Sequence, residues 1–114
     1  MENLNFEIKG KSYTTSDLRV GKIVDLWKMR TALSMGTYGQ MYRISMDSAD
    51  EAILAIDIEA FMTTFCSKFI EDLKPGTIRD MGMDDYKKLK DLYLSEIKPW
   101  LDEVEGLLKK SENV

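Results

Sequence analysis

Asp57 and Glu59 are two carboxylates among apolar residues, and of all residues in the chain this pair looks most capable of chemistry. Paired carboxylates can bind a hard cation or exchange protons with a substrate. The segment around them has helical spacing, however, and residues two positions apart on a helix point about 200° apart. Because the two side chains cannot share one ligand, we expect charges that face solvent or a protein interface, and no metal or catalytic site.

Other reactive residue types are scarce. The chain has one cysteine, Cys66, and no histidine, so it lacks the common zinc ligand sets, an imidazole base and a Ser-His-Asp triad. Cys66 lies in a phenylalanine-rich segment, which favours a buried and inert thiol. Gly36 and Gly39 lack the rest of a phosphate-binding loop or a dinucleotide fingerprint. We therefore expect a protein that is not an enzyme and has no cofactor.

Composition narrows the class of protein further. The chain has 114 residues, of which 44% are hydrophobic and 32% charged, as in one folded domain. Its 16 basic and 20 acidic residues give a net charge of −4, which disfavours nucleic acid as a partner. No apolar run approaches the roughly 18 residues of a membrane span, and no signal-peptide pattern is present. We expect a cytoplasmic protein with no membrane partner.

The first fifteen residues alternate between apolar and polar side chains. Leu4, Phe6 and Ile8 fall on one face of an extended run. A turn at residues 9–11 and a second short run with Tyr13 complete the pattern of a β-hairpin. A two-stranded hairpin is marginal alone in water, so its apolar face should pack on helices.

A first helix is expected to begin at about residue 18 and to end near Gly36. Polar residues at 14–17 offer N-caps, although Gly21 also allows the helix to start just after Val20. The residues from 34 to 47 break the helical pattern and form a loop rich in methionine and tyrosine. The apolar residues that recur at near-helical spacing in this segment are Leu18, Val20, Ile23, Val24 and Trp27.

Two further helical segments follow the loop. A capping box of Ser48 and Glu51 starts the central and most buried helix, which either continues to Leu73 or breaks at residues 66–67. The last segment begins after Met83 and keeps one apolar stripe to about residue 107. Pro99 should kink it near residue 95 or divide it into two helices there.

These elements predict an α+β fold: a predominantly helical single domain, with a short N-terminal β-hairpin packed on three to four helices. The domain should span residues 1–110, and residues 111–114 should form a frayed tail. Methionine and tyrosine adapt well to partner surfaces, and aromatic rings with a polar group suit partly wet interfaces. The predicted protein-interaction residues are therefore Met35, Tyr38, Met41, Tyr42, Met46 and Trp100.

The order of elements resembles small proteins encoded among the morphogenesis genes of tailed bacteriophages. The strand pair at 6–13, the acidic capped helix and a closing helix with Tyr93 and Pro99-Trp100 carry the likeness, most of it in residues 18–33 and 86–108. Within that group the chain is most similar to the tail assembly chaperones, short acidic proteins with an opening hairpin and a helical bundle. The resemblance implies a non-enzymatic interaction module that masks aggregation-prone virion components in the bacterial cytoplasm.

Its expected partners are other phage structural or assembly proteins, and self-association is a further possibility. Two alternatives stay open. The protein could be a permanent small structural subunit of the virion, in the capsid, neck or tail, with the loop as a fixed contact. It could instead be a small acidic inhibitor of a host protein, with the acidic residues of the central helix imitating a polyanion.

Overall fold

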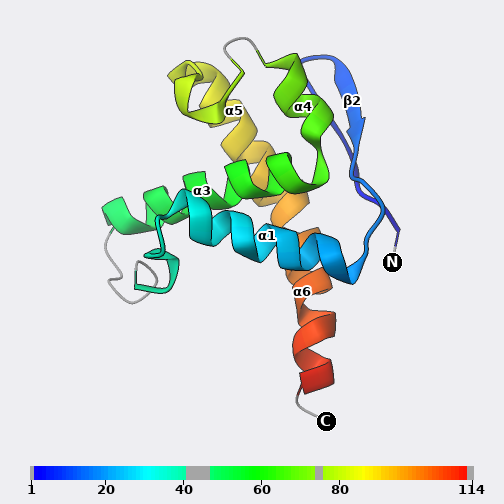
Figure 1. Ribbon diagram of the computed structural model, residues 1–114. Coiled ribbons are helices and arrows are strands. Elements are labelled where there is room, and N and C mark those ends of the chain that lie inside the picture. The colour runs from blue at the N-terminus through cyan, green and yellow to red at the C-terminus, as the bar shows by residue number, and fades with distance from the viewer. Residues whose placement is uncertain (1, 41–46, 74–75, 113–114) are drawn as a thin grey trace.

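The computed structural model describes residues 2–40, 47–73 and 76–112, and of residues 47–49 and 108–112 the backbone alone. Helices α1 and α3 lie side by side and run in opposite directions (Figure 1). A rod formed by α5, η2 and α6 crosses behind them, and the N-terminal hairpin lies along one side (Figure 1). The elements are β1 (Asn5–Ile8), β2 (Lys11–Thr14), α1 (Val20–Leu33), α3 (Asp47–Phe65), α4 (Ser67–Asp72), η1 (Ile78–Asp80), α5 (Met83–Leu92), η2 (Tyr93–Ile97) and α6 (Lys98–Glu112).

The predicted hairpin is confirmed. Strands β1 and β2 pair antiparallel through a two-residue turn at Lys9 and Gly10, whose φ angles of 51° and 76° match a type I′ turn. The register places Phe6 opposite Tyr13, and their buried rings stack 5.8 Å apart. Tyr13 also meets Phe69 of α4 edge to face at 5.5 Å. The apolar side of the hairpin is thus covered by helices, as its marginal stability requires.

The polar residues between the hairpin and α1 do not cap the helix, contrary to the expectation. The helix starts at Val20 after Arg19, and no side chain caps it. Thr15 instead exchanges two hydrogen bonds with the backbone of Leu4, and the amide of Ser16 donates to the carbonyl of Phe65 at 2.8 Å. These residues therefore attach the hairpin to the end of α3, a long-range contact that local spacing does not reveal.

The centre of the core is α3, as expected. Its side chains Ile58, Phe61 and Phe65 are fully buried. The helix ends at Phe65, and Cys66 forms the junction to α4. Of the two predicted arrangements, the break at residues 66–67 is confirmed, with Cys66 at the N-cap position.

The interruption predicted near residue 95 takes the form of a π-helical turn between α5 and α6. Proline lacks an amide proton and clashes with the carbonyl of the preceding turn. The chain responds with a wider π-helical turn, η2, in which the amide of Lys98 donates to the carbonyl of Tyr93. The rod therefore continues from α5 into α6, and its stripe of Leu89, Tyr93 and Ile97 stays buried.

The predicted fold class is confirmed: an N-terminal hairpin packs on a mostly helical body. Helix α6 extends to Glu112, two residues into the segment expected to fray. Within the described part of the chain, no helix is both long and apolar enough to cross a bilayer.

Candidate functional site

Three of the six predicted interaction residues lie in the described structure, and they occupy different environments. Met35 is 90% exposed. Tyr38 is partly buried and contacts charged side chains of α1 and α3. Trp100 is partly buried and meets Phe61 and Phe65 edge to face, at 6.2 and 5.9 Å, so it belongs largely to the core. Met41, Tyr42 and Met46 lie outside the described residues, and the three that are described do not share one environment.

Tyr38 belongs to a charged network, centred on Arg30, that joins α1, α3 and α6. Arg30 forms ion pairs with Asp57 of α3 (Nε to Oδ1, 3.0 Å) and Glu105 of α6 (Nη1 to Oε1, 2.8 Å). The Tyr38 hydroxyl donates to Oδ1 of Asp57 at 2.6 Å, and its ring lies 5.6 Å from the guanidinium of Arg30. Three helices are therefore held together by one largely buried cation.

The electrostatics of this network follow from its burial. Desolvation raises the pKa of Asp57, although the hydrogen bond from Tyr38 and the charge of Arg30 oppose the shift. Desolvation lowers the pKa of Arg30, but the nearby carboxylates outweigh it, so the net pKa is raised. Arg30 therefore stays charged, and removal of either partner would leave an uncompensated charge in the interior.

Asp57 and Glu59 do face different partners, and of the two expected settings, solvent or a protein interface, the first does not hold because both side chains are mostly covered. Glu59 lies 3.6 Å from Arg79 Nε of η1, and both carboxylate side chains are mostly buried. Among the described residues, no three acidic or cysteine side chains gather into a group that could hold a metal. Cys66 is buried as predicted, and burial raises the pKa of its thiol, which disfavours the reactive thiolate.

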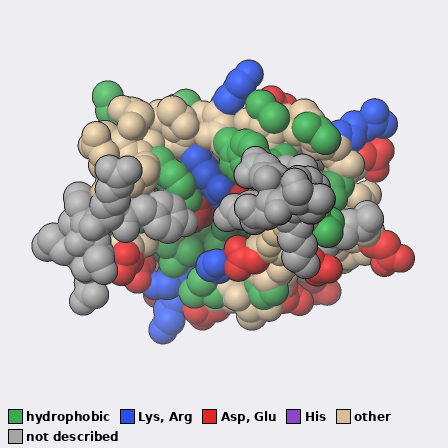
Figure 2. All heavy atoms as spheres, turned by 90° about the horizontal axis from the view of Figure 1, so that it is seen from below, with side chains coloured by type: hydrophobic (Ala, Val, Ile, Leu, Met, Phe, Trp, Pro, Cys, Tyr) green, Lys and Arg blue, Asp and Glu red, His purple; other side chains and the backbone are tan. Residues whose placement is uncertain are grey.

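The outer face of α1, defined by Val20, Val24 and Trp27, is apolar and accessible. Val20 is 69% exposed, Val24 36% and Trp27 41%. A shallow hollow of about 460 Å³ lies beside Val24 and Trp27. The helical spacing of the apolar residues from 18 to 27 predicted the helix but did not say which of them would be exposed. On the face seen in Figure 2, hydrophobic side chains reach the surface at several places among basic and acidic ones.

A second set of apolar residues on α1, in addition to those that face the core, could have identified this surface. Ile23 and Leu26 already supply the buried stripe of the helix. A helix that is apolar on more than one side is either buried all round or has a second face for a partner. The periodicity alone could not tell which stripe faces the core.

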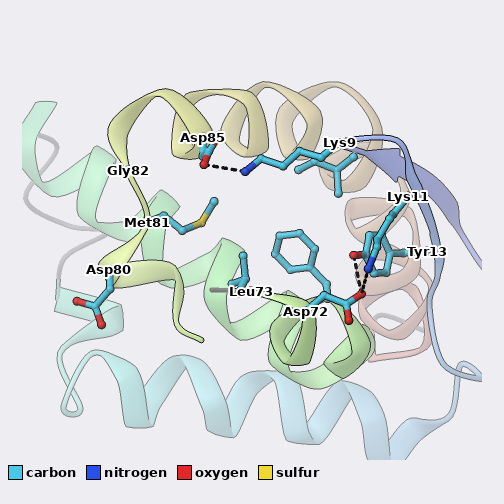
Figure 3. A pocket seen from close by; sticks show the side chains of 11 residues that line it. Lys9, Lys11, Tyr13, Asp72, Leu73, Asp80, Met81, Gly82 and Asp85 are labelled. Carbon is cyan, nitrogen blue, oxygen red and sulfur yellow. Dashed lines mark hydrogen bonds and ion pairs between the residues drawn. The ribbon is translucent and has the colours of Figure 1, made fainter. Parts of the chain in front are cut away.

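A separate cavity, the hairpin pocket, lies between the hairpin turn, α4 and the start of α5 (Figure 3). Its volume is about 340 Å³, and apolar side chains including Phe69, Leu73 and Met81 line it. Lys9 of the turn reaches across one side to Asp85 of α5, with 2.7 Å between Nζ and Oδ2 (Figure 3). The pocket therefore combines an apolar lining with a charged rim, as ligand sites commonly do.

Asp72 of α4 carries the opposite side of the rim. Its Oδ2 accepts from the Tyr13 hydroxyl at 2.9 Å and from Lys11 Nζ at 3.3 Å, and Lys68 lies 3.5 Å from Oδ1. The hydrogen bond from Tyr13 is the main cause that lowers the pKa of Asp72. Burial and the bond to Asp72 raise the pKa of Tyr13 to about 12. Asp72 thus remains a fixed carboxylate at neutral pH.

The geometry of both surfaces favours binding. The pocket is lined by two ion-paired lysines, by three aspartates of which Asp72 and Asp85 are ion-paired, by a hydrogen-bonded tyrosine and by apolar side chains. The outer face of α1 offers apolar contact area. Comparison of the chain with protein-family models, curated proteins and solved structures found no significant match.

Proposed function

We propose that this protein is a non-enzymatic protein–protein interaction module that contacts its partner through the outer face of α1 and Met35. The observation that carries the proposal is the exposure of Val20, Val24 and Trp27, at positions i, i+4 and i+7 of one helix. Single exposed apolar residues are ordinary on protein surfaces, but a stripe of them along a helix is typical of a contact site. Trp is also among the residues enriched at binding hot spots.

Met35, just beyond the end of α1, is a further exposed apolar side chain. The helix ends in a Schellman motif, in which Gly36 N donates to Thr31 O and Met35 N donates to Ala32 O. Met35 occupies the left-handed position of this motif, with φ 54°, where glycine is usual. The backbone of Met35 is strained and its large apolar side chain is almost fully exposed, so this residue contributes little to the stability of the fold. That combination supports a role in binding.

We propose further that the protein acts as a tail assembly chaperone of a tailed bacteriophage. The resemblance of residues 18–33 and 86–108 to that family supports this setting, as does the net charge of −4. The exposed stripe of α1 lies inside the first of these segments. It offers an apolar surface that could cover a hydrophobic virion component before assembly.

Co-expression with the products of neighbouring genes tests the proposal. We expect one such product to be insoluble alone, and to become soluble and to co-purify with this protein. Mass spectrometry of purified particles should then find essentially none of this protein. Stoichiometric amounts in the particle would instead favour a permanent virion subunit. Co-purification with a host enzyme and with no phage product would favour the inhibitor.

A further inference from the structure

We propose that the partner segment that binds the outer face of α1 carries an acidic side chain beside a large apolar one, and that its carboxylate binds between α1 and the end of α3. This inference rests on the proposed function and adds the chemistry of the partner. The observation that carries it is a group of cations on the accessible side of α1 that form no ion pair within the described structure.

The accessible side of α1 is basic, although the chain as a whole has a net charge of −4. Arg19, at the N-cap position, and Lys22 and Lys28 of the helix have no ion-pair partner among the described residues, and Arg19 and Lys28 are exposed. Arg30, the other basic residue of α1, is largely buried with its own two carboxylates. The single acidic residue of α1 is Asp25. A partner with negative charge is therefore attracted to this side of the helix.

Two of these cations line one hollow, the polar hollow, which lies between α1 and the end of α3 and has a volume of about 400 Å³. Because the two helices run antiparallel (Figure 1), Lys22 near the start of α1 meets Thr64 near the end of α3, and its Nζ donates to the carbonyl of Thr64 at 3.2 Å. An ammonium has three donors, so Lys22 keeps donors for a ligand. Lys28 lines the same hollow about 9 Å further along the helix, within reach of a shared carboxylate.

The polar hollow adjoins the apolar hollow beside Val24 and Trp27. Lys28 and Ala32 line both of them. One segment can therefore place an apolar side chain against Val24 and Trp27 and a neighbouring carboxylate at Lys28. The apolar contacts favour a protein segment over a nucleic acid, which would use the cations alone and would be repelled by the net charge of the chain.

Titration of the full chain with three short peptides tests this inference by amide NMR: acetyl-Leu-Glu-Leu-amide, its glutamine analogue and its lysine analogue. We expect the glutamate peptide to bind in the millimolar range and to shift the amides of Asp25, Lys28 and Thr64 most. The glutamine peptide should bind more weakly, by about fivefold, the factor expected for one exposed charge pair. The lysine peptide should bind weakest of the three.

Variants of the polar hollow make the test specific. Lys28→Gln should weaken the glutamate peptide about fivefold, whereas Asp25→Asn should strengthen it because a competing carboxylate is removed. Lys87→Gln is the matched control: Lys87 is an exposed lysine of α5 that has no ion-pair partner in the described part of the chain and lines neither hollow. Its substitution should change the affinity less than about twofold. A thermal melt of each variant checks that it is folded.

Three outcomes with the peptides would overturn the inference. The first is no binding of any peptide at about 10 mM, well above the expected range. The second is equal binding of the glutamate and glutamine peptides, with both lost in Val24→Ser, because the face would then bind apolar side chains regardless of charge. The third is equal weakening by Lys28→Gln and Lys87→Gln, because the effect would then come from net charge.

A single-stranded oligonucleotide provides a further arm of the test. If it binds more tightly than the glutamate peptide and loses affinity in Lys28→Gln, the cations serve a polyanion, and the inference is overturned. Each peptide outcome above leaves the proposed function standing, since co-expression with neighbouring gene products tests that function without the peptides. Failure of the inference and failure of the proposed function are therefore distinguishable.

Discussion

The hydroxyl of Tyr38 donates a 2.6 Å hydrogen bond to Oδ1 of Asp57, 19 positions further along the chain. This bond attaches the segment after α1 to the middle of the core helix α3. It also places Tyr38 beside Arg30, whose two ion pairs join α1 to α3 and α6. Tyr38 thus stabilises the fold, while Met35, three residues earlier, is left on the surface.

Tyr38→Phe should lower the free energy of unfolding by about 1–2 kcal/mol, because the buried carboxylate of Asp57 loses a hydrogen-bond donor. Urea denaturation at pH 7 measures the change. Tyr86→Phe is the matched control: the Tyr86 hydroxyl is buried without a hydrogen-bond partner among the described residues, so its removal should leave the stability unchanged or raise it. Equal losses of stability in the two variants would show that the hydrogen bond to Asp57 makes no specific contribution to the free energy of unfolding.

Arg30→Ala should cost about 3–5 kcal/mol at pH 7, because it leaves two carboxylates largely buried without their cation. Arg79→Ala removes a mostly exposed partner of Glu59 and should cost less than about 1 kcal/mol. Urea denaturation of both variants and the parent at pH 7 checks this ranking.

The same Arg30→Ala variant should show a distinctive pH dependence. Burial already raises the pKa of Asp57 in the folded protein, and loss of Arg30 raises it further. A carboxyl group whose pKa is higher folded than unfolded binds its proton more tightly in the folded state, so it stabilises the fold as pH falls through the folded pKa. The deficit of Arg30→Ala relative to the parent should therefore shrink between pH 7 and about pH 4.5. A deficit that grows with acidity would contradict this reading of the network.

Met35→Gly should stabilise the protein by about 0.5–1 kcal/mol, since glycine accepts a φ of 54° without strain. Gly36→Ala should do the opposite, because alanine at φ 82° is strained although its Cβ would meet no neighbour. Thermal melts of both variants show whether each substitution raises or lowers the stability. If Met35→Gly destabilises, the methionine contributes packing and our view of it as a surface contact residue is wrong.

Local patterns were enough to predict the elements whose determinants lie close together in the sequence. The alternation around Lys9-Gly10 specified the hairpin, and the spacing of Phe61 and Phe65 identified the central helix. At Cys66 the pattern allowed both a continuous helix and a break, because the two arrangements have similar local free energies. At Pro99 the pattern located the interruption but not its form, a π-helical turn in which the amide of Lys98 donates to the carbonyl of Tyr93.

The contact surfaces were harder to predict because they depend on which face of an element is covered. Val20, Val24 and Trp27 have the spacing of a core stripe, and their exposure follows from the position of α3 on the other side of α1. Tyr38 is a residue type common at contact surfaces, but its hydroxyl donates a hydrogen bond to Asp57 and its side chain is partly buried. The hairpin pocket joins residues from three distant segments, so no local motif indicates it.

The central claim, that the outer face of α1 binds a partner protein, is tested most directly by the affinity for the gene-neighbour product that co-purifies with the full chain. Val20→Ser/Val24→Ser should weaken that affinity by about thirtyfold or more, equivalent to about 2 kcal/mol, with a nearly unchanged melt because both side chains are accessible. The control Met83→Ser/Leu94→Ser alters two other exposed apolar side chains and should bind like the parent. Equal affinities for the parent and the α1 variant, or an equal loss in the control, would contradict the account.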